Sequence, residues 1–555
     1  MPADGASDHT ITVEKKEPEM SKAWAIAAAL GCLASGAYAA APGPAPSTAP
    51  GTPDRIQDSE TARPDEVTTT GSVTINGTKL SYRATAGTLA VSSGDSASAQ
   101  RDTGTDADTA QAVMSYVAYF KSGTPTGDRP ITFFWDGGPG SSTVFLHIGA
   151  FGPRRLAVGD GHVPPAPYQL VNNAHSLLDA SDLVFIDAPG TGFGRVSGKD
   201  AERAFRSVDG DAHAFEAFIK LFLSRYQRWN SPRFIFGESY GTLRSAVVIE
   251  GLQRESAIEF NGMVQLSQVL SYDTDVDGIN PGDDQAYINA LPSYAATAWY
   301  HHRLGADRPA TLEPFLKEVE HFARTEYAQA LQMGSELDPA RRQEVAARFA
   351  ALTGLAPDYV LKADLRIDVR HFRKALLEKS GLTTGDLDSR FVGPVLDPLA
   401  GASEYDPLAA SIGSAFVSTY NNYARTSLGY GQNKTFAPVI AVPDFEFSHS
   451  GSQTTSSNQG GLSVMSDLAS AMKRNPNLKI LLLGGYFDLS TPYFSGWYEM
   501  HHLPMPPGIE GNIEYRYYPS GHMVYLNEDS LKIMHDDVAR FIEQNRAGSA
   551  RLSLP

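Results

Sequence analysis

Residues 237–241 read G-E-S-Y-G and present Ser239 in a setting suited to nucleophilic chemistry. An apolar run at 234–236 precedes the motif, and a helix-forming stretch at 242–252 follows it. This is the strand–turn–helix context of a nucleophile elbow, where flanking glycines avoid collisions with the neighbouring strand and helix. A serine hydroxyl is a weak nucleophile at neutral pH, so it needs a base and an acid that orients the base. We therefore predict that Ser239 is a nucleophile with partners elsewhere in the chain.

Two later residues, Asp488 and His522, have the order and spacing of those partners. Asp488 follows an apolar run at 478–483, and His522 follows a second strand-like run at 513–518. The 522 − 488 = 34 residues between them leave room for one helix and one strand. Because the carboxyl ends of parallel strands meet at one edge of a sheet, we expect all three side chains there. The sequence thus predicts a Ser239–Asp488–His522 triad.

A glycine-rich turn supplies candidate donors for the oxyanion that acyl transfer creates. Residues 137–140 read G-G-P-G and follow an apolar run at 131–135. Glycines at such a turn let backbone N–H groups face a reacting carbonyl. We assign the oxyanion hole to the N–H groups of Gly138 and of Tyr240, the residue after the nucleophile.

The elements that must position these residues predict an α/β fold. Short apolar runs at 183–186, 234–236 and 478–483 each end at glycine or at a D-A-P-G turn, with helical stretches between them. Continuous apolar runs of this kind indicate parallel strands that are buried on both faces. Earlier β-like runs at 72–75 and 79–83 flank an Asn-Gly turn, which predicts a hairpin. We expect a mostly parallel central sheet.

The pattern of short apolar runs that indicates buried strands is absent between residues 280 and 400. Phe315, Val319 and Phe322 share one helical face, and Asp338 begins another helix that Gly354 ends. Asp368 is placed to begin a third helix. A mainly helical insertion in a parallel-sheet domain is expected to form a cap over the site, and the alternative is an extra domain without a role in substrate binding.

Four ordered motifs resemble those of the serine carboxypeptidase family. They are W-D-G-G-P-G-S-S at 135–142 with F-G-P at 151–153, F-I-D-A-P-G-T-G-F at 185–193, G-E-S-Y-G at 237–241 and G-H-M-V at 521–524. The resemblance extends from about residue 71 to 542. It implies an α/β-hydrolase fold with a helical cap, and an enzyme that removes single residues from peptides with a free C-terminus. It implies no metal and no organic cofactor.

The resemblance also implies a role for three residues in substrate binding. Glu238 matches a glutamate that helps bind the terminal carboxylate of the substrate as a protonated acid, and Gly137 matches a backbone contributor to the same anchor. Asp136 stands where the family has asparagine, so an amide donor is replaced by a group that donates only when protonated.

A second departure from the family concerns its other acidic anchor, which falls at Ala150. His147 and Arg154 lie nearby in the sequence and are candidates for a replacing cation. The lack of possible disulfides, with Cys32 as the single cysteine, differs from secreted eukaryotic members and favours a bacterial exported relative.

The amino-acid composition argues against several classes of binding partner. The 63 acidic and 46 basic residues give a net charge of −17, which disfavours nucleic acid. The histidine pairs at 301–302 and 501–502 lack carboxylates at ligand spacing, so we predict no metal site. The one long apolar stretch, near the N-terminus, is too short to span a bilayer.

The N-terminal region has the features of an export signal. Lys22 is followed by an apolar run at 24–33 and by Ala-Tyr-Ala at 37–39, which predicts cleavage after Ala39 and a periplasmic or secreted protein. Lipid attachment at Cys32 and a simple alanine-rich tail are the alternatives. The expected domain boundaries are as follows: extension and signal peptide 1–39, flexible linker 40–70, hydrolase core 71–279 and 401–545, helical insertion 280–400, tail 546–555.

Two other functions are compatible with these motifs. An esterase or acyltransferase would use the same triad, and a non-catalytic binding protein could keep the fold. Reaction with a fluorophosphonate separates the last of these from the enzymes, because only a working nucleophile would be labelled.

Overall fold

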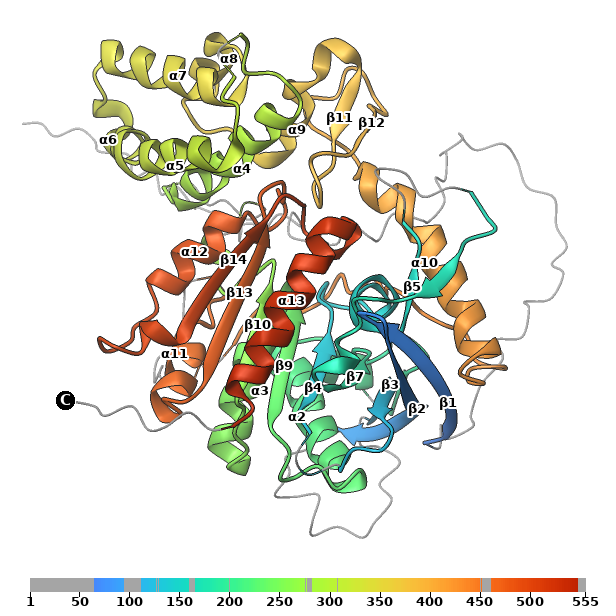
Figure 1. The fold of residues 1–555 in the computed structure, drawn as a ribbon. Helices are drawn as coiled ribbons and strands as arrows, with labels where there is room; N and C mark the ends of the chain where they lie inside the picture. The colour runs from blue at the N-terminus through green and yellow to red at the C-terminus, as the bar shows by residue number, and fades with distance from the viewer. Residues whose placement is uncertain are drawn as a thin grey trace, which may run out of the picture.

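A computed structural model describes residues 64–547 except 94–110, 126, 128, 159–164, 199, 275, 277–281, 307, 450 and 452–460. Its centre is a twisted sheet with the strand order β1-β2-β3-β7-β4-β9-β10-β13-β14 (Figure 1). The strands of the central sheet are β1 Glu66–Ile75, β2 Thr78–Ser92, β3 Gln111–Lys121, β4 Ile131–Trp135, β7 Asp182–Ile186, β9 Arg233–Glu238, β10 Gly262–Leu266, β13 Lys479–Gly485 and β14 Ile513–Tyr518, and the short β8 Arg195–Ser197 pairs with β3. Two separate two-stranded sheets are formed by β5 Arg154–Leu156 with β6 Leu170–Asn172 and by β11 Leu382–Thr384 with β12 Val392–Pro394.

Neighbouring strands from β7 to β14 are parallel, whereas β1, β2 and β3 pair antiparallel at the other edge. The strands β4, β7 and β10 are buried along their whole length, as expected for parallel strands covered on both faces. The prediction of an α/β-hydrolase fold with a mostly parallel sheet is confirmed.

Helices cover both faces of the sheet, and others gather in one insertion. They are α1 Ala201–Phe205, α2 Val208–Arg225, α3 Tyr240–Ser256, α4 Gln285–Tyr300, α5 Leu312–Phe322, α6 Ala328–Met333, α7 Pro339–Thr353, α8 Pro357–Lys362, α9 Val369–Leu376, α10 Pro407–Thr426, α11 Met465–Arg474, α12 Tyr493–His501 and α13 Glu528–Asn545. Residues of α2, α3 and α11 share one apolar cluster with the sheet, and residues of α10 and α13 share another with its opposite face.

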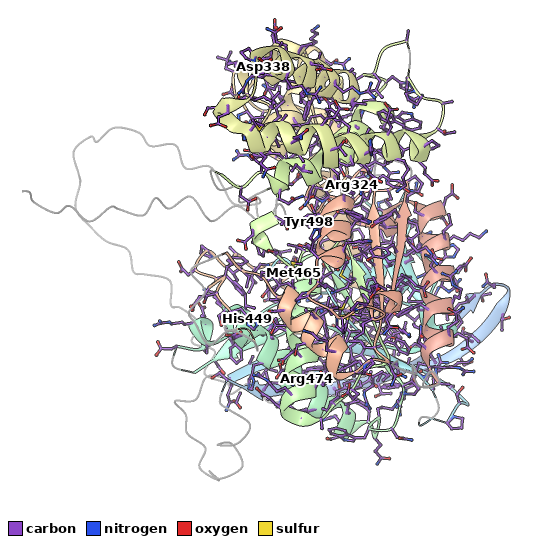
Figure 2. The ribbon with its side chains drawn as sticks, turned by 90° about the vertical axis from the view of Figure 1, so that its left-hand side faces the viewer. Arg324, Asp338, His449, Met465, Arg474 and Tyr498 are labelled. Atoms are coloured by element: carbon purple, nitrogen blue, oxygen red, sulfur yellow. The ribbon has the colours of Figure 1, made fainter. Side chains whose placement is uncertain are left out.

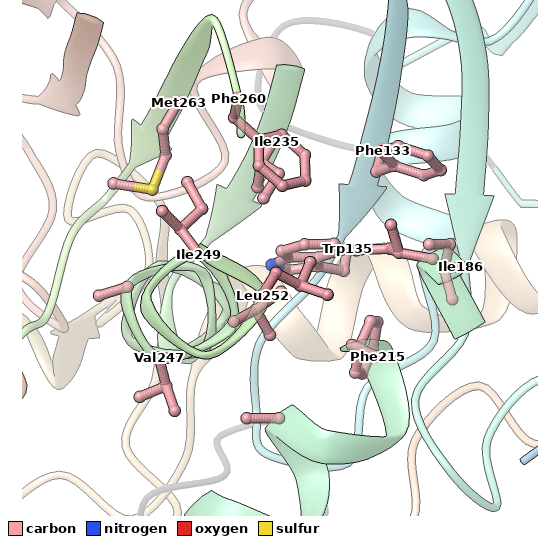
Figure 3. Packing of buried hydrophobic residues seen from close by; sticks show 14 of the residues in the cluster. Phe133, Trp135, Ile186, Phe215, Ile235, Val247, Ile249, Leu252, Phe260 and Met263 are labelled. Carbon is pink, nitrogen blue, oxygen red and sulfur yellow. The ribbon is translucent and has the colours of Figure 1, made fainter. Parts of the chain in front are cut away.

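Trp135 lies at the centre of the first cluster, among Phe215 of α2 and the apolar side chains of α3 (Figure 3). Its ring lies edge-on to Phe215, with 5.1 Å between the ring centres. The indole N–H is directed at helix α3, where it donates to the carbonyl of Gly241 over 2.9 Å. Since a buried indole N–H needs a partner, Trp135 fixes β4 relative to the start of α3.

The insertion, from α4 to β12, lies at one end of the sheet and has its own apolar cluster (Figures 1 and 2). Phe487 and Leu489, which flank Asp488, belong to this cluster. Arg324 lies at the boundary, with its guanidinium 5.2 Å from the centre of the Trp497 ring in α12 (Figure 2). The insertion is therefore packed against the segment that carries the predicted acid.

The expected helices of the insertion are present, with small changes at their ends. Asp338 accepts hydrogen bonds from the N–H groups of Ala340 and Arg341 at the start of α7, and Gly354 ends that helix in a left-handed conformation. Asp368 caps α9 in the same manner. After α9 the chain forms the short hairpin of β11 and β12, which the helical pattern did not predict.

The expected linker at 40–70 is wrong at its C-terminal end, because β1 begins at Glu66. The serine and threonine content of this segment resembles a linker, yet threonine is also favoured in strands, and β1 pairs with β2 along its whole length. The signal peptide, Cys32 and most of the linker lie outside the described residues, as do residues 548–555 of the tail.

Among the described residues, no helix is both long and apolar enough to cross a membrane.

Candidate functional site

Ser239 occupies the sharp turn between β9 and α3 with φ 58° and ψ −133°. Left-handed values are costly for a serine, so the surrounding structure must impose them. A Cβ atom at Gly237 would lie 2.4 Å from the carbonyl oxygen of Gly241. A Cβ atom at Gly241 would lie 3.0 Å from the carbonyl oxygen of Asp136. The two glycines therefore permit the tight turn, as the sequence predicted.

A buried hydrogen-bond network holds this turn from below. Arg244 of α3 pairs with Asp211 of α2 over 2.7 Å, and a second nitrogen of its guanidinium donates to the backbone carbonyl of Asp136 over 2.6 Å. Together with Trp135, Arg244 joins the loop after β4 to helix α3. The loop that carries Asp136 and the helix that follows Ser239 are thus fixed to each other by side chains that are buried from solvent.

His522 and Asp488 form a buried pair, with 2.9 Å between Nδ1 and Oδ2. The other carboxylate oxygen, Oδ1, accepts from the N–H groups of Ser490 and Thr491, each over 2.9 Å. Asp488 is 0% and His522 is 4% exposed. Burial alone would lower the pKa of His522, but the charge of Asp488 and its hydrogen bond outweigh burial and raise that pKa. The imidazole is therefore held as an oriented base.

Strand β10 brings the nucleophile and this pair to the same edge. The N–H of Ser239 donates to the carbonyl of Leu266 over 3.0 Å. The hydroxyl of the next residue, Ser267, donates to the carbonyl of His522 over 2.8 Å. The consecutive residues Leu266 and Ser267 thus contact Ser239 and His522, respectively. Sequence analysis did not identify β10, because its five residues include the polar Gln265 and follow no clear pattern.

The glycine-rich loop after β4 lies directly against the elbow. A Cβ atom at Gly137 would lie 2.7 Å from the backbone nitrogen of Tyr240 and 2.8 Å from Cβ of Ser239. Gly138 has φ 110°, a conformation that side chains rarely adopt. Tyr240 is the first residue of α3, where backbone N–H groups lack partners within the helix. The loop that carries Gly138 therefore lies against Tyr240 and Ser239 through Gly137, and the assignment of Gly138 and Tyr240 as oxyanion donors stays a prediction.

Two carboxyl groups adjoin the nucleophile, and both are buried. Asp136 Oδ1 accepts from the N–H of Gly137 over 2.9 Å, while Oδ2 is enclosed without a hydrogen-bond partner. Burial raises the pKa of Asp136 to about 6. Burial and the charge of Asp136 raise the pKa of Glu238 well above its usual range. The pair Asp136 and Glu238 thus favours a shared proton over two charges.

Tyr525 is a site residue that sequence analysis missed. Its hydroxyl lies 3.1 and 3.0 Å from the two carboxylate oxygens of Glu238. It follows G-H-M-V by one position, so only its place in the sequence beside His522 hinted at a role. A phenol donates to the carboxyl and leaves the proton of a neutral Glu238 free for another acceptor.

The suggestion that His147 supplies a cation is wrong. Its side chain is 1% exposed and lies 2.7 Å from the hydroxyl of Tyr119, and burial lowers its pKa to about 3. Both His147 and Ala150 belong to a buried π-helical turn, Leu146–Phe151. Arg154 lies beside Tyr82, where burial raises the tyrosine pKa and the charge of Arg154 only partly offsets that rise.

The histidine pairs also have ordinary contacts. His301 Nε2 lies 2.7 Å from the carbonyl oxygen of Ser389, while His501 and His502 bond to carbonyls one turn back in their helix. Within the described part of the chain, no three His, Cys, Asp or Glu side chains are grouped so as to hold a metal ion.

Residues 105–335 match the family model for serine carboxypeptidases. The resemblance to this family is confirmed. A curated relative, serine carboxypeptidase ctsa-3.2 of Caenorhabditis elegans, is 29% identical over 152 residues, which cover 25% of this chain and 27% of the relative. The chain thus aligns with about a quarter of that serine carboxypeptidase. The match to the family model includes Asp136, Glu238 and Ser239, and Asp488 and His522 lie beyond it.

Solved structures with some similarity include two hydrolase-fold proteins. A proline iminopeptidase from Mycobacterium smegmatis has 13% identity and a TM-score of 0.34, over 79% of this chain and 97% of that one. An alpha/beta hydrolase fold protein from Chitinophaga pinensis has 11% identity and a TM-score of 0.31, over 85% and 97%.

Proposed function

We propose that this protein is a serine carboxypeptidase that cleaves C-terminal peptide bonds through an acyl-enzyme. The observation that carries the proposal is the buried His522–Asp488 pair at the same sheet edge as the strained Ser239. In this reaction Ser239 Oγ attacks the scissile carbonyl carbon as His522 Nε2 removes the hydroxyl proton. The N–H groups of Gly138 and Tyr240 stabilise the resulting oxyanion.

The second half of the reaction reuses the same groups. His522 transfers its proton to the leaving amine, so the C–N bond breaks and the amino acid departs. A water molecule then gives a proton to His522 and attacks the acyl-enzyme, which releases the shortened peptide and restores the Ser239 hydroxyl. Asp488 keeps His522 in the required tautomer and stabilises its charged form.

Preference for a free C-terminus is assigned to Asp136 and Glu238. A carboxylate anchor normally uses a cation, but a neutral carboxylic acid can also donate a hydrogen bond to an anion. Burial and mutual repulsion favour protonation of this pair, and Tyr525 donates to Glu238. We infer that the protonated pair binds the terminal carboxylate of the substrate, with the N–H of Gly137 beside it.

Two measurements test this function. A fluorophosphonate should label Ser239, and mass spectrometry of a long peptide incubated with the enzyme should show stepwise loss from the C-terminus. Trimming from the N-terminus or internal cleavage would refute the carboxypeptidase assignment. Hydrolysis of simple esters without any trimming of peptides would indicate the esterase or acyltransferase alternative.

We also propose that the protein is exported, with cleavage after Ala39. The support is the sequence of residues 20–39, which lie outside the described structure. N-terminal sequencing of protein recovered from a producing cell should begin at Ala40. A mature protein that retains Met20 would contradict cleavage, and a lipid on Cys32 would show attachment to a membrane.

A further inference from the structure

A short segment of the insertion, residues 386–390, passes between the loop of Asp488 and the loop of His522. We call this segment the brace. It follows β11 and precedes β12, so it is the tip of the small hairpin in the insertion. No motif of the sequence marks this segment. Its contacts join the insertion to both members of the predicted acid–base pair.

The first set of contacts surrounds Asp488. The N–H of Leu489 donates to the carbonyl of Asp386 over 2.9 Å. The N–H of Ser389 donates to the carbonyl of Phe487, also over 2.9 Å. The residues on each side of Asp488 are thus bonded to the brace through their backbones, as neighbouring strands would be.

The second set of contacts holds the loop of His522. The N–H of His522 donates to the carbonyl of Leu387 over 2.6 Å, and the N–H of Gly521 donates to the Asp388 carboxylate over 3.2 Å. A Cβ atom at Gly521 would lie 2.4 Å from the carbonyl oxygen of Leu387. Glycine at position 521 is therefore required by the close approach of the brace, independently of any substrate.

An ion pair makes the brace rigid. Arg390 contacts both carboxylate oxygens of Asp388, with distances of 2.6 Å from Nη2 to Oδ2 and 2.9 Å from Nε to Oδ1. The same guanidinium donates to the carbonyl of Pro519 over 2.8 Å and to the hydroxyl of Ser520 over 3.1 Å. Asp388 is 1% exposed. A two-pronged pair with a buried carboxylate specifies geometry well, because a planar guanidinium fixes several partners at once.

Helix α4 of the insertion holds the middle of the brace. The hydroxyl groups of Thr297 and Ser389 lie 2.6 Å apart, and His301 Nε2 donates to the carbonyl of Ser389 over 2.7 Å. A displacement of α4 would therefore be transmitted through Ser389 to the two loops.

We propose that Asp388 and Arg390 are positioning residues, which set the distance and orientation between Asp488 and His522. This inference rests on the proposed function. It also gives the insertion a role as part of the support for the base. Misplacement of a catalytic group by about 1 Å can cost roughly 10²-fold in rate.

Arg390→Gln tests the proposal in the full-length enzyme. We expect kcat for peptide hydrolysis to fall about 10- to 100-fold, with KM within about threefold of wild type, because the variant misorients the base and leaves the anchor unchanged. Asp388→Asn should also lower kcat, and the double variant should lose little more than Arg390→Gln, since the two residues act as a unit. A kcat within twofold of wild type for Arg390→Gln, or additive losses in the double variant, would overturn the proposal.

Arg366→Gln is the matched control. Arg366 makes a two-pronged ion pair with Asp284 inside the insertion, over 2.7 and 2.8 Å, and it contacts neither loop. The Arg366→Gln variant should have a lower melting temperature than wild type and an unchanged kcat. An equal loss of kcat in this control would show that general loosening of the insertion explains the effect. If Arg390→Gln does not fold, Arg390→Lys keeps the charge with fewer contacts and should show the same loss of kcat at unchanged KM.

A spectroscopic measurement separates failure of this inference from failure of the proposed function. The proton on His522 Nδ1, in its hydrogen bond to Asp488, should give a far-downfield ¹H resonance that is absent from His522→Ala. Arg390→Gln should shift or broaden it, and Arg366→Gln should not. An identical resonance in wild type and Arg390→Gln would refute the brace. A wild-type protein that shows the resonance but neither hydrolyses peptides nor reacts with fluorophosphonate would refute the function alone.

Discussion

At the scale of single residues, Asp136 and Glu238 create a site whose affinity depends on protons. Protonated, the pair donates hydrogen bonds and carries at most one charge. Fully ionised, it would repel the carboxylate that it is proposed to bind. Burial places the pKa of Asp136 at about 6, and that of Glu238 lies well above the usual range for a carboxyl group. The pair therefore begins to lose its donors around pH 6, where Asp136 ionises.

Asp136→Asn replaces the titrating donor by an amide that donates at every pH. Because the raised pKa means that Asp136 is protonated below about pH 6 and charged above it, the wild-type KM for free-carboxylate peptides should increase through that region. In the variant the increase should move to higher pH, where Glu238 ionises, and KM at pH 7 to 8 should be lower than in wild type. The measurement is kcat/KM against pH for both proteins.

Peptides with an amidated C-terminus provide the control for this comparison, since they carry no charge at that end. Their profiles should differ little between wild type and Asp136→Asn. If the profiles of the two proteins coincide for free-carboxylate peptides as well, Asp136 has no part in binding the terminus.

Ser239→Ala should abolish labelling by fluorophosphonate and reduce peptide hydrolysis by roughly 10⁴-fold or more. The fold should be retained, because alanine keeps the Cβ atom and adds no new strain at φ 58°. His522→Ala should reduce peptide hydrolysis by a similar factor. The double variant of Ser239→Ala and His522→Ala should lose little more activity, since members of a triad act together. Circular dichroism checks the fold. Substantial activity in Ser239→Ala with the wild-type pH profile would identify a different nucleophile.

At the scale of elements, the site depends on how closely the loop after β4 approaches the start of α3. Gly137 is the point of contact, because an added Cβ would meet backbone atoms of Glu238 and Tyr240 within 2.8 Å. Neither strand can move away easily, since β4 pairs with β9 in register along five residues.

Gly137→Ala should therefore displace the loop, remove most of the reaction with fluorophosphonate and lower stability by roughly 1–3 kcal/mol, as expected for overpacking. Gly413→Ala is the control. It lies in helix α10 with open space at its Cβ position, so it should leave the reaction unchanged and stabilise the helix by about 0.5–1 kcal/mol. Unimpaired labelling of Gly137→Ala would contradict the assigned oxyanion loop. Thermal unfolding and labelling rates provide both readouts.

The elements also differ in how well the sequence alone predicted them. Strands with continuous apolar runs, such as β7 and β13, and helices with clear caps, such as α7, were identified because local pattern specifies them. The positions of Ser239, Asp488 and His522 followed from the order of their motifs. Tyr525 and the brace could not be predicted, because their roles come from contacts across long sequence separations. Arg390 and Ser520, for example, are 130 residues apart.

At the scale of the whole molecule, the proposed chemistry uses a hydroxyl, an imidazole and carboxyl groups. Neither a metal ion nor a thiol takes part in any step. Peptide hydrolysis should therefore be unchanged by EDTA and by iodoacetamide. Inactivation by EDTA that zinc restores would show that a metal contributes. Protein treated with fluorophosphonate serves as the inactive reference in the same assay.

The brace has a further consequence during synthesis of the chain. Ser239 leaves the ribosome early, but the brace contacts Phe487, Leu489 and His522, which are synthesised much later. Strand β10, whose Leu266 accepts a hydrogen bond from Ser239, can complete its own hydrogen bonding only after β13 has been synthesised. A nascent chain thus holds the Ser239 hydroxyl without its proposed base until His522 has emerged from the ribosome. The order of the elements along the chain therefore delays the proposed peptide cleavage until the segment that carries His522 has been synthesised.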